Sequence, residues 1–167
     1  MGLTQVDGLD AVKLAEHVGA TVRCADELTT RDKLEALEEL QPGAFSACTF
    51  QIGTRHYIVY SPLSTLGRRQ SDLAHEVAHL LLKHELKEIQ QLGPLTFYSC
   101  DPHEEQEANW LAGCLLLPRS LLVRAARQGL DAAAIAEKFV VSEQMANYRL
   151  RATGVLIQLK AGRGQHR

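Results

Sequence analysis

Apolar residues recur at helical spacing in several stretches of the chain. Val12, Ala15 and Val18 share one face of a first predicted helix. Asp10 before them is a suitable N-cap, and Gly19 after them is a suitable end. The same reasoning predicts further helices over residues 29–40, 64–93, 102–118, 119–128, 131–138 and 142–153.

The longest of these, over residues 64–93, is expected to be mostly helical. Ser71 or Asp72 is the expected cap of its inner part, since serine and aspartate side chains accept hydrogen bonds from free helix N–H groups. Gly93 and Pro94 are expected to break the chain after it.

An alternating pattern predicts a small β-sheet. Residues 45–52 alternate with period two, Gly53-Thr54 is a turn, and the run RHYIVY over 55–60 returns, which together indicate an antiparallel hairpin. Two shorter segments are also β-prone, TVRC and, as a last strand, VLIQL at 155–159. We therefore expect an α+β fold, mostly helical, with a small hairpin sheet beside a helical body.

Composition narrows the class of protein. A chain of 167 residues buries roughly two thirds of its unfolded surface and can form a core without disulfides. The N-terminus lacks the pattern of a secretory signal, and no apolar run approaches the length of a membrane span. The four cysteines form no CxxC, which argues against a cysteine zinc knuckle and favours reduced thiols. We expect a cytoplasmic protein that does not bind membranes.

Charge is unevenly distributed along the chain. Residues 119–167 contain 9 Lys+Arg and 3 Asp+Glu, a net charge of +6, whereas residues 1–118 have a net charge of −8. A basic C-terminal third could face an acidic partner or nucleic acid. The last basic residues, in LKAGRGQHR, are more typical of a solvated, frayed tail.

The segment RRQSDLAHEVAHLLLKH contains the most specific chemical signal. His75 and His79 are four residues apart, so on a helix they lie ~40° apart and one turn from each other. Two imidazoles at that spacing can bind one zinc ion. Glu76, rotated ~100° from His75, should miss the metal and act as general base on a water beside it. Because this HExxH pattern fixes only three positions, the rest of the site must support it.

A catalytic zinc site needs a third protein ligand. The extended HExxHxxGxxH pattern fails, because Leu82 and Glu85 stand at its required positions. His84 lies ~140° round the helix from His79 and is expected to be a surface histidine. The third ligand should therefore come from the helix over 102–118. Its carboxylates leave three candidates, Glu104, Glu105 and Glu107, and helical periodicity does not decide between Glu105 and Glu104.

Three blocks of the sequence together resemble the ImmA/IrrE family of bacterial metallopeptidases. They are LAHEVAHLLLKH, EQEANWLAGCLLLP and IAEKFVVSEQMANYRLRATG, in the family's order. The resemblance implies that His75, His79 and Glu105 bind Zn²⁺ and that Glu76 is the catalytic base. It makes Asn109 a positioning residue beside the metal ligands.

The chain departs from the family pattern at four packing positions, which are Ser71, Asp72, Leu111 and Leu117. None of them is an expected metal ligand, so the departures affect subtype and substrate rather than the metal. The resemblance also implies a zincin-like peptidase core over residues 1–118. Residues 119–160 would then be a helix-turn-helix-like subdomain packed on the core, with 161–167 as a flexible tail.

The family resemblance implies an endopeptidase of narrow specificity. Its substrate would be a separate protein chain, a helix-turn-helix repressor whose cleavage releases stress-response or mobile-element genes. The hairpin over 45–60 could offer an edge strand to an extended peptide, or could be ordinary core sheet. Candidates for stabilising the transition state are Tyr98, His103, Tyr57 and His56.

Two other functions remain open. Residues 131–153 resemble a helix-turn-helix, so DNA binding is the weaker alternative; Gln144 and Asn147 are the only amides suited to base edges on its second helix. A second alternative is a non-catalytic regulator that contains zinc. The lack of a clear fourth ligand in the sequence favours catalysis, because structural zinc sites usually have four protein ligands.

Overall fold

A computed structural model describes residues 8–84, 89–92, 95–98 and 101–158, with only the backbone of 89–92 and 95–98. Its fold is α+β, which confirms the prediction. The elements in chain order are α1 (Ala11–His17), β1 (Ala20–Cys24), η1 (Ala25–Glu27), α2 (Arg31–Leu40), β2 (Ala47–Ile52), β3 (Arg55–Tyr60), α3 (Leu66–Leu82), β4 (Ile89–Leu92), β5 (Leu95–Tyr98), α4 (Pro102–Leu116), α5 (Arg119–Arg127), α6 (Ala132–Phe139) and α7 (Glu143–Thr153).

The main sheet has three strands in the order β1-β3-β2. The predicted hairpin is confirmed, because β2 and β3 are antiparallel with Thr49 opposite Ile58. The β-prone segment TVRC at 21–24 lies in strand β1, which pairs with β3 in parallel. That pairing leaves β2 at one edge of this sheet, on the side of the candidate site.

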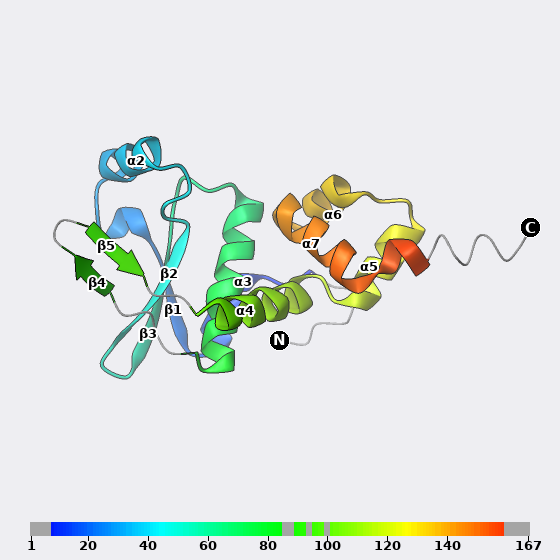
Figure 1. The fold of residues 1–167 in the computed structure, drawn as a ribbon, viewed down its shortest axis with the longest axis horizontal. Coiled ribbons are helices and arrows are strands. Elements are labelled where there is room, and N and C mark those ends of the chain that lie inside the picture. Colours follow the sequence, from blue (N-terminus) through cyan, green and yellow to red (C-terminus); the bar gives the residue numbers. More distant parts are fainter. Residues whose placement is uncertain (1–7, 85–88, 93–94, 99–100, 159–167) are drawn as a thin grey trace, which may run out of the picture.

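Helices α3 and α4 cross in the middle of the molecule, with the sheet on one side and α5–α7 on the other (Figure 1). Both helices contribute fully buried side chains to the hydrophobic core, among them Leu73 and Val77 of α3 and Ala108 and Ala112 of α4. Because α3 and α4 hold the histidine pair and the candidate carboxylates, this crossing determines where those side chains meet.

Two secondary-structure predictions were wrong. Residues 89–92 form strand β4 rather than the end of a helix, because α3 stops at Leu82 and Lys83 is left-handed (φ 60°). Residues 155–158 are helical, not a strand, with Ile157 and Gln158 N–H groups donating to the Gly154 carbonyl. A short apolar run does not distinguish helix from strand by its pattern alone.

The cap of α3 also differs from the expectation. Thr65, not Ser71 or Asp72, caps the helix, and its hydroxyl accepts from the Arg68 N–H. Ser71 is instead buried inside α3, where its Oγ accepts a hydrogen bond of 2.9 Å from the Ser142 N–H at the start of α7.

Helix α7 is attached to both central helices. A Cβ on Gly67 of α3 would clash with the Val141 carbonyl oxygen, so the two backbones touch there. The buried Arg149 side chain of α7 packs against Gly113 of α4, and its Nε donates to the Leu117 carbonyl at the end of α4. The negative C-terminal end of the α4 dipole also stabilises the positive charge of Arg149 there. The predicted division into core and subdomain at residue 118 stays a prediction.

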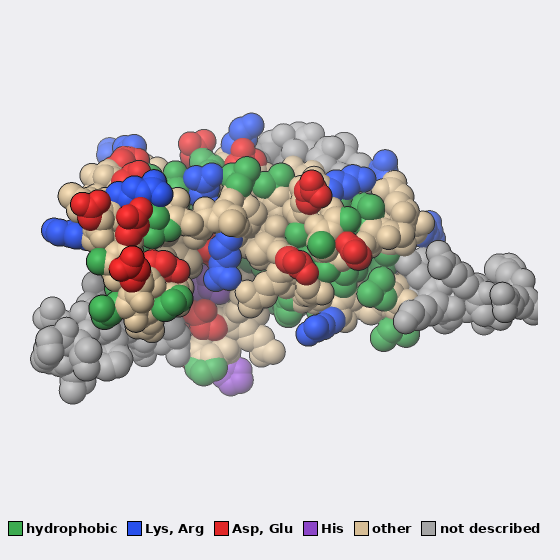
Figure 2. All heavy atoms as spheres, turned by 90° about the horizontal axis from the view of Figure 1, so that it is seen from above, with side chains coloured by type: hydrophobic (Ala, Val, Ile, Leu, Met, Phe, Trp, Pro, Cys, Tyr) green, Lys and Arg blue, Asp and Glu red, His purple; other side chains and the backbone are tan. Residues whose placement is uncertain are grey.

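Charged side chains are mixed on the face shown in Figure 2. Lys and Arg side chains there are scattered among Asp and Glu over both ends of the molecule. Within the described residues, no helix is both long enough and apolar enough to cross a membrane.

The close contact at Gly67 can be tested by Gly67→Ala. Alanine normally favours a helix interior by about 0.5–1 kcal/mol over glycine. Here the added methyl must displace the Val141 backbone, and such overpacking typically costs about 1–3 kcal/mol. We expect a lower free energy of unfolding in urea. Gly8→Ala is the control, since nothing lies within 4 Å of a Cβ there. A Gly67→Ala protein as stable as the wild type would contradict the contact.

Candidate metal centre and active-site cleft

Helix α3 presents His75 and His79 on the face that meets α4. Their neighbours Leu73, Ala74 and Val77 are fully buried, which fixes the rotation of the helix. The two Nε2 atoms lie 3.0 Å apart. Both side chains are largely shielded from solvent, 18% and 9% exposed. The predicted shared direction of the two imidazoles is therefore what the structure shows.

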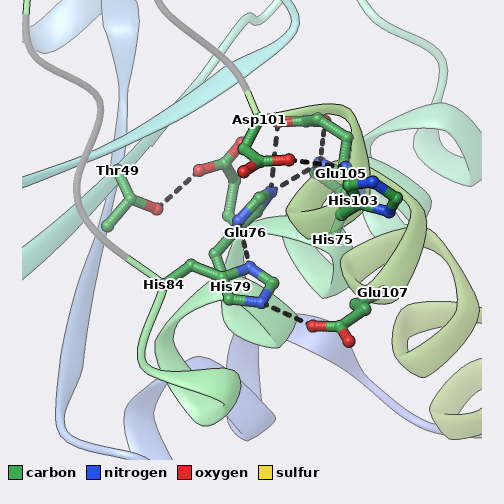
Figure 3. A network of polar contacts seen from close by, with 9 residues as sticks. All are labelled: Thr49, His75, Glu76, His79, His84, Asp101, His103, Glu105 and Glu107. Carbon is green, nitrogen blue, oxygen red and sulfur yellow. Dashed lines mark hydrogen bonds and ion pairs between the residues drawn. The ribbon is translucent and has the colours of Figure 1, made fainter.

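Glu105 completes the cluster from α4. Asp101 caps this helix by accepting from the His103 N–H, so Glu105 falls in the first turn. Its Oε2 lies 3.2 Å from His75 Nε2, and its Oε1 lies 3.5 Å from His79 Nε2 (Figure 3). Of the three glutamates that the sequence left open, Glu105 is the one that the structure brings to both histidines.

The spacing of the three side chains fits a metal ion. Tetrahedral ligands at zinc-like bond lengths of about 2.0–2.1 Å are separated from each other by roughly 3.3 Å. The three separations in the structure, 3.0, 3.2 and 3.5 Å, bracket that value. Among the described residues, the group that could hold a metal has these three members and no fourth histidine, cysteine or carboxylate. A set of three protein ligands is typical of catalytic sites.

Glu76 lies beside this cluster and is held by the sheet. Its Oε2 accepts a 2.6 Å hydrogen bond from the Thr49 hydroxyl of β2 (Figure 3). Thr49 was not among the residues predicted for the site. The alternation of the hairpin placed it on one face of β2, but only the packing of β2 on α3 shows that this face meets Glu76.

His84 is not the surface histidine that the sequence suggested. Its side chain is only 7% exposed, and its Nδ1 lies 3.0 Å from His79 Nδ1. Its Nε2 lies 3.2 Å from a carboxylate oxygen of Glu107. The angular estimate failed because it assumed a continuing helix, whereas α3 ends at Leu82 and the chain turns back.

A cleft of about 790 Å³ opens beside the cluster. One side of the cleft is lined by Ala47 of β2 and by Ser46, which precedes that strand. Another side is lined by Gln144 and Tyr148 of α7. The α7 wall is held in place because Arg68 of α3 donates to the Gln144 side chain at 3.1 Å. The helix-turn-helix-like segment therefore contributes to the same cleft as the candidate metal ligands.

Asp72 lies in this cleft one helical turn before His75. Burial raises the pKa of its carboxyl above the ordinary value of 3.8, and the neighbouring Arg68 guanidinium offsets this only in part. The Asp72–Arg68 pair is 2.9 Å apart, with the Asp72 side chain 13% exposed. The floor of the cleft thus contains a partly buried ion pair besides the candidate metal ligands.

The other candidate residues are less closely placed. Asn109 lines the cleft one turn beyond Glu105, and its positioning role stays a prediction. His103 is exposed and is not among the residues that line the cleft. Tyr57 stacks on Phe50, on the opposite face of the sheet from Thr49. The Tyr98 side chain lies outside the described part of the structure.

Comparison with known families supports a peptidase. Residues 30–151, more than half of the chain, match the family described as Peptidase_M78: IrrE N-terminal-like domain. The match spans the hairpin, both central helices and nearly all of α7. Searches of curated proteins and of solved structures found no match.

The metal centre predicts a sharp difference between neighbouring glutamates. Glu105→Ala removes one of the three candidate ligands, so we expect the purified variant to contain less divalent metal than the wild type. Glu104→Ala changes the adjacent residue of the same helical turn and should keep one ion per chain. Inductively coupled plasma mass spectrometry after gel filtration gives both values. Equal metal content in the two variants would contradict the assignment of Glu105.

Proposed function

The chain belongs to the IrrE N-terminal-like family of peptidases, and we propose that it is a zinc-dependent endopeptidase of narrow specificity. The observation that carries this proposal is the meeting of His75, His79 and Glu105 beside Glu76, at the side of a cleft. Two imidazoles and a carboxylate are a donor set that suits zinc, although manganese could replace it.

The chemistry follows from the roles that these side chains can fill. Zinc held by His75, His79 and Glu105 would supply a Lewis acid that lowers the pKa of a water and polarises the scissile carbonyl. Glu76 would take the proton of the attacking water and return it to the departing amine. The Thr49 hydroxyl donates to Glu76 Oε2, which restrains the carboxylate, and Oε1 would then take the proton.

The edge position of β2 suits an extended peptide substrate. Within the described strands of the main sheet, β2 is paired on one side only, with β3. Ala47 of β2 and the preceding Ser46 line the cleft. A substrate segment that added a strand along β2 would therefore pass the metal centre, with backbone hydrogen bonds supplying affinity.

We further propose that the substrate is a separate protein in the cytoplasm. A helix-turn-helix repressor is the candidate that the family resemblance suggests, with derepression of stress or mobile-element genes as the consequence. The cleft walls support narrow specificity, because Gln144 and Tyr148 of α7 restrict what lies opposite β2.

DNA binding by residues 131–153 is the second candidate function, since α6 and α7 do form a helix–turn–helix arrangement. Gln144 is one of the two amide side chains that could read base edges. Its side-chain oxygen already accepts a hydrogen bond from Arg68. Arg149 is buried against α4. These contacts favour a role for α7 in the peptidase cleft. A non-catalytic zinc regulator is distinguished by the following experiment.

The variant Glu76→Gln separates catalysis from metal binding. Removing a general base typically lowers the rate by about 10²–10⁴-fold, while the three candidate ligands are unchanged. We expect new protein N-termini in bacterial cells that express the wild type, detected by N-terminal proteomics, and none with Glu76→Gln. The purified variant should still bind zinc. Glu104→Gln is the matched control and should cleave like the wild type.

The same fragments in both the wild-type and the Glu76→Gln cells would contradict the peptidase mechanism. If neither protein produced new N-termini and both still bound zinc, the result would instead favour the non-catalytic zinc regulator.

A further inference from the structure

The C-terminal end of α3 has a backbone conformation that needs an explanation. Lys83 adopts the left-handed region, with φ 60°, although it is not a glycine. That conformation costs a non-glycine residue roughly 1–2 kcal/mol. The turn is closed by the His84 N–H, which donates to the His79 carbonyl at 3.0 Å. Its effect is to direct His84 back over the last turn of α3.

The returned His84 side chain lies between a candidate metal ligand and a carboxylate. Its Nδ1 is 3.0 Å from His79 Nδ1, with the rings edge to face and their centroids 5.0 Å apart. Its Nε2 is 3.2 Å from Glu107 Oε2 (Figure 3). His79 Nε2, the opposite atom of that ring, faces His75 and Glu105. His84 therefore contacts the nitrogen of His79 that points away from the metal centre.

We infer that His84, supported by Glu107, is a positioning residue that holds His79 ready to bind metal. This inference rests on the proposed metal site. Metal-binding histidines usually donate their second ring N–H to an acceptor, which fixes the tautomer and the ring orientation. Here the acceptor is another imidazole, whose own proton position is set in turn by a carboxylate.

The proton positions follow from the donors and acceptors. His79 needs a lone pair on Nε2 to bind a metal, so its proton must be on Nδ1. His84 Nδ1 must then accept that proton's hydrogen bond, which places the His84 proton on Nε2. Glu107 accepts from that N–H. With the opposite tautomer of His84, a lone pair would face the carboxylate oxygen at 3.2 Å. Glu107 thus favours the one arrangement that leaves His79 able to bind.

His84 and Glu107 should differ in how strongly they affect metal affinity. The His84 side chain is 7% exposed, whereas Glu107 is 66% exposed. Contacts of an exposed carboxylate are weakened by solvent. Loss of His84 should therefore lower metal affinity substantially, by about 10–100-fold as for other partners of metal-bound histidines, and loss of Glu107 should have a smaller effect.

The test compares two replacements of His84 that differ in one property. In His84→Asn, Oδ1 takes about the place of the imidazole Nδ1 and can still accept from His79. In His84→Leu, the side chain has a similar volume but cannot accept. Zinc affinity is measured by competition with a chromophoric chelator at pH 8, with His17→Ala, an exposed site on α1, as control. Urea unfolding of the metal-free proteins shows whether each variant is folded.

We expect His84→Leu to bind zinc about 10–100-fold more weakly than the wild type and His84→Asn to stay within about threefold. Wild-type affinity in His84→Leu would overturn the inference. Equal weakening in both variants would overturn it as well, since the effect would then come from packing rather than from the acceptor. A wild type that binds no zinc would instead contradict the proposed function, and this inference with it.

A second pair of variants tests the contact between Glu107 and His84 without changing the buried histidines. Glu107→Gln keeps an acceptor for His84 Nε2–H, while Glu107→Lys places a donor there. Zinc affinity should be near the wild-type value in the first and several-fold lower in the second. In the metal-free protein, ¹⁵N NMR should show the His79 proton on Nδ1 in the wild type and Glu107→Gln, and less so in Glu107→Lys. Identical affinities and tautomers in the two variants would overturn the role of Glu107.

Discussion

The packing of α4 across α3 brings one carboxylate onto two imidazoles, and the rest of the site depends on that contact. His75, His79 and Glu105 come from positions 30 residues apart at most in the sequence, yet their ligand atoms all lie within 4.8 Å of each other. Small buried side chains, Ala74 and Ala78 on α3 with Ala108 and Ala112 on α4, belong to the core between these helices. Larger residues at those positions would separate the helices and with them the ligands.

Hydrogen bonds and close backbone contacts join β2 and α7 to the crossing helices α3 and α4, and together these elements line the cleft. Thr49 joins β2 to Glu76, and the Ser142 N–H joins the start of α7 to Ser71. Gly67 lets the Val141 backbone approach α3, and Gly113 leaves room for Arg149 against α4. The helical C-terminal segment is therefore tied to the same two helices that hold the candidate ligands. A peptide bound between β2 and α7 would lie between elements that are attached to the helices of the candidate metal centre.

Much of this arrangement could be predicted from local patterns. The helical spacing placed His75 and His79 on one face, and the alternating run at 45–60 indicated the hairpin that the structure contains. Periodicity could not choose between Glu104 and Glu105, because that choice depends on how α4 packs on α3. His84 was misplaced because neither glycine nor proline marks the left-handed turn at Lys83. The contact of Thr49 with Glu76 likewise depends on tertiary packing that no local pattern encodes.

The most direct test of the metal centre is an X-ray structure of the zinc-loaded protein, with anomalous data collected on both sides of the zinc absorption edge. We expect one strong peak per chain, at about 2.0–2.1 Å from His75 Nε2, His79 Nε2 and a Glu105 oxygen. We also expect the Glu76 carboxylate to keep its hydrogen bond to Thr49 without binding the ion. A zinc peak elsewhere, or a site in which Glu105 is not a ligand, would show that the proposed metal centre is wrong.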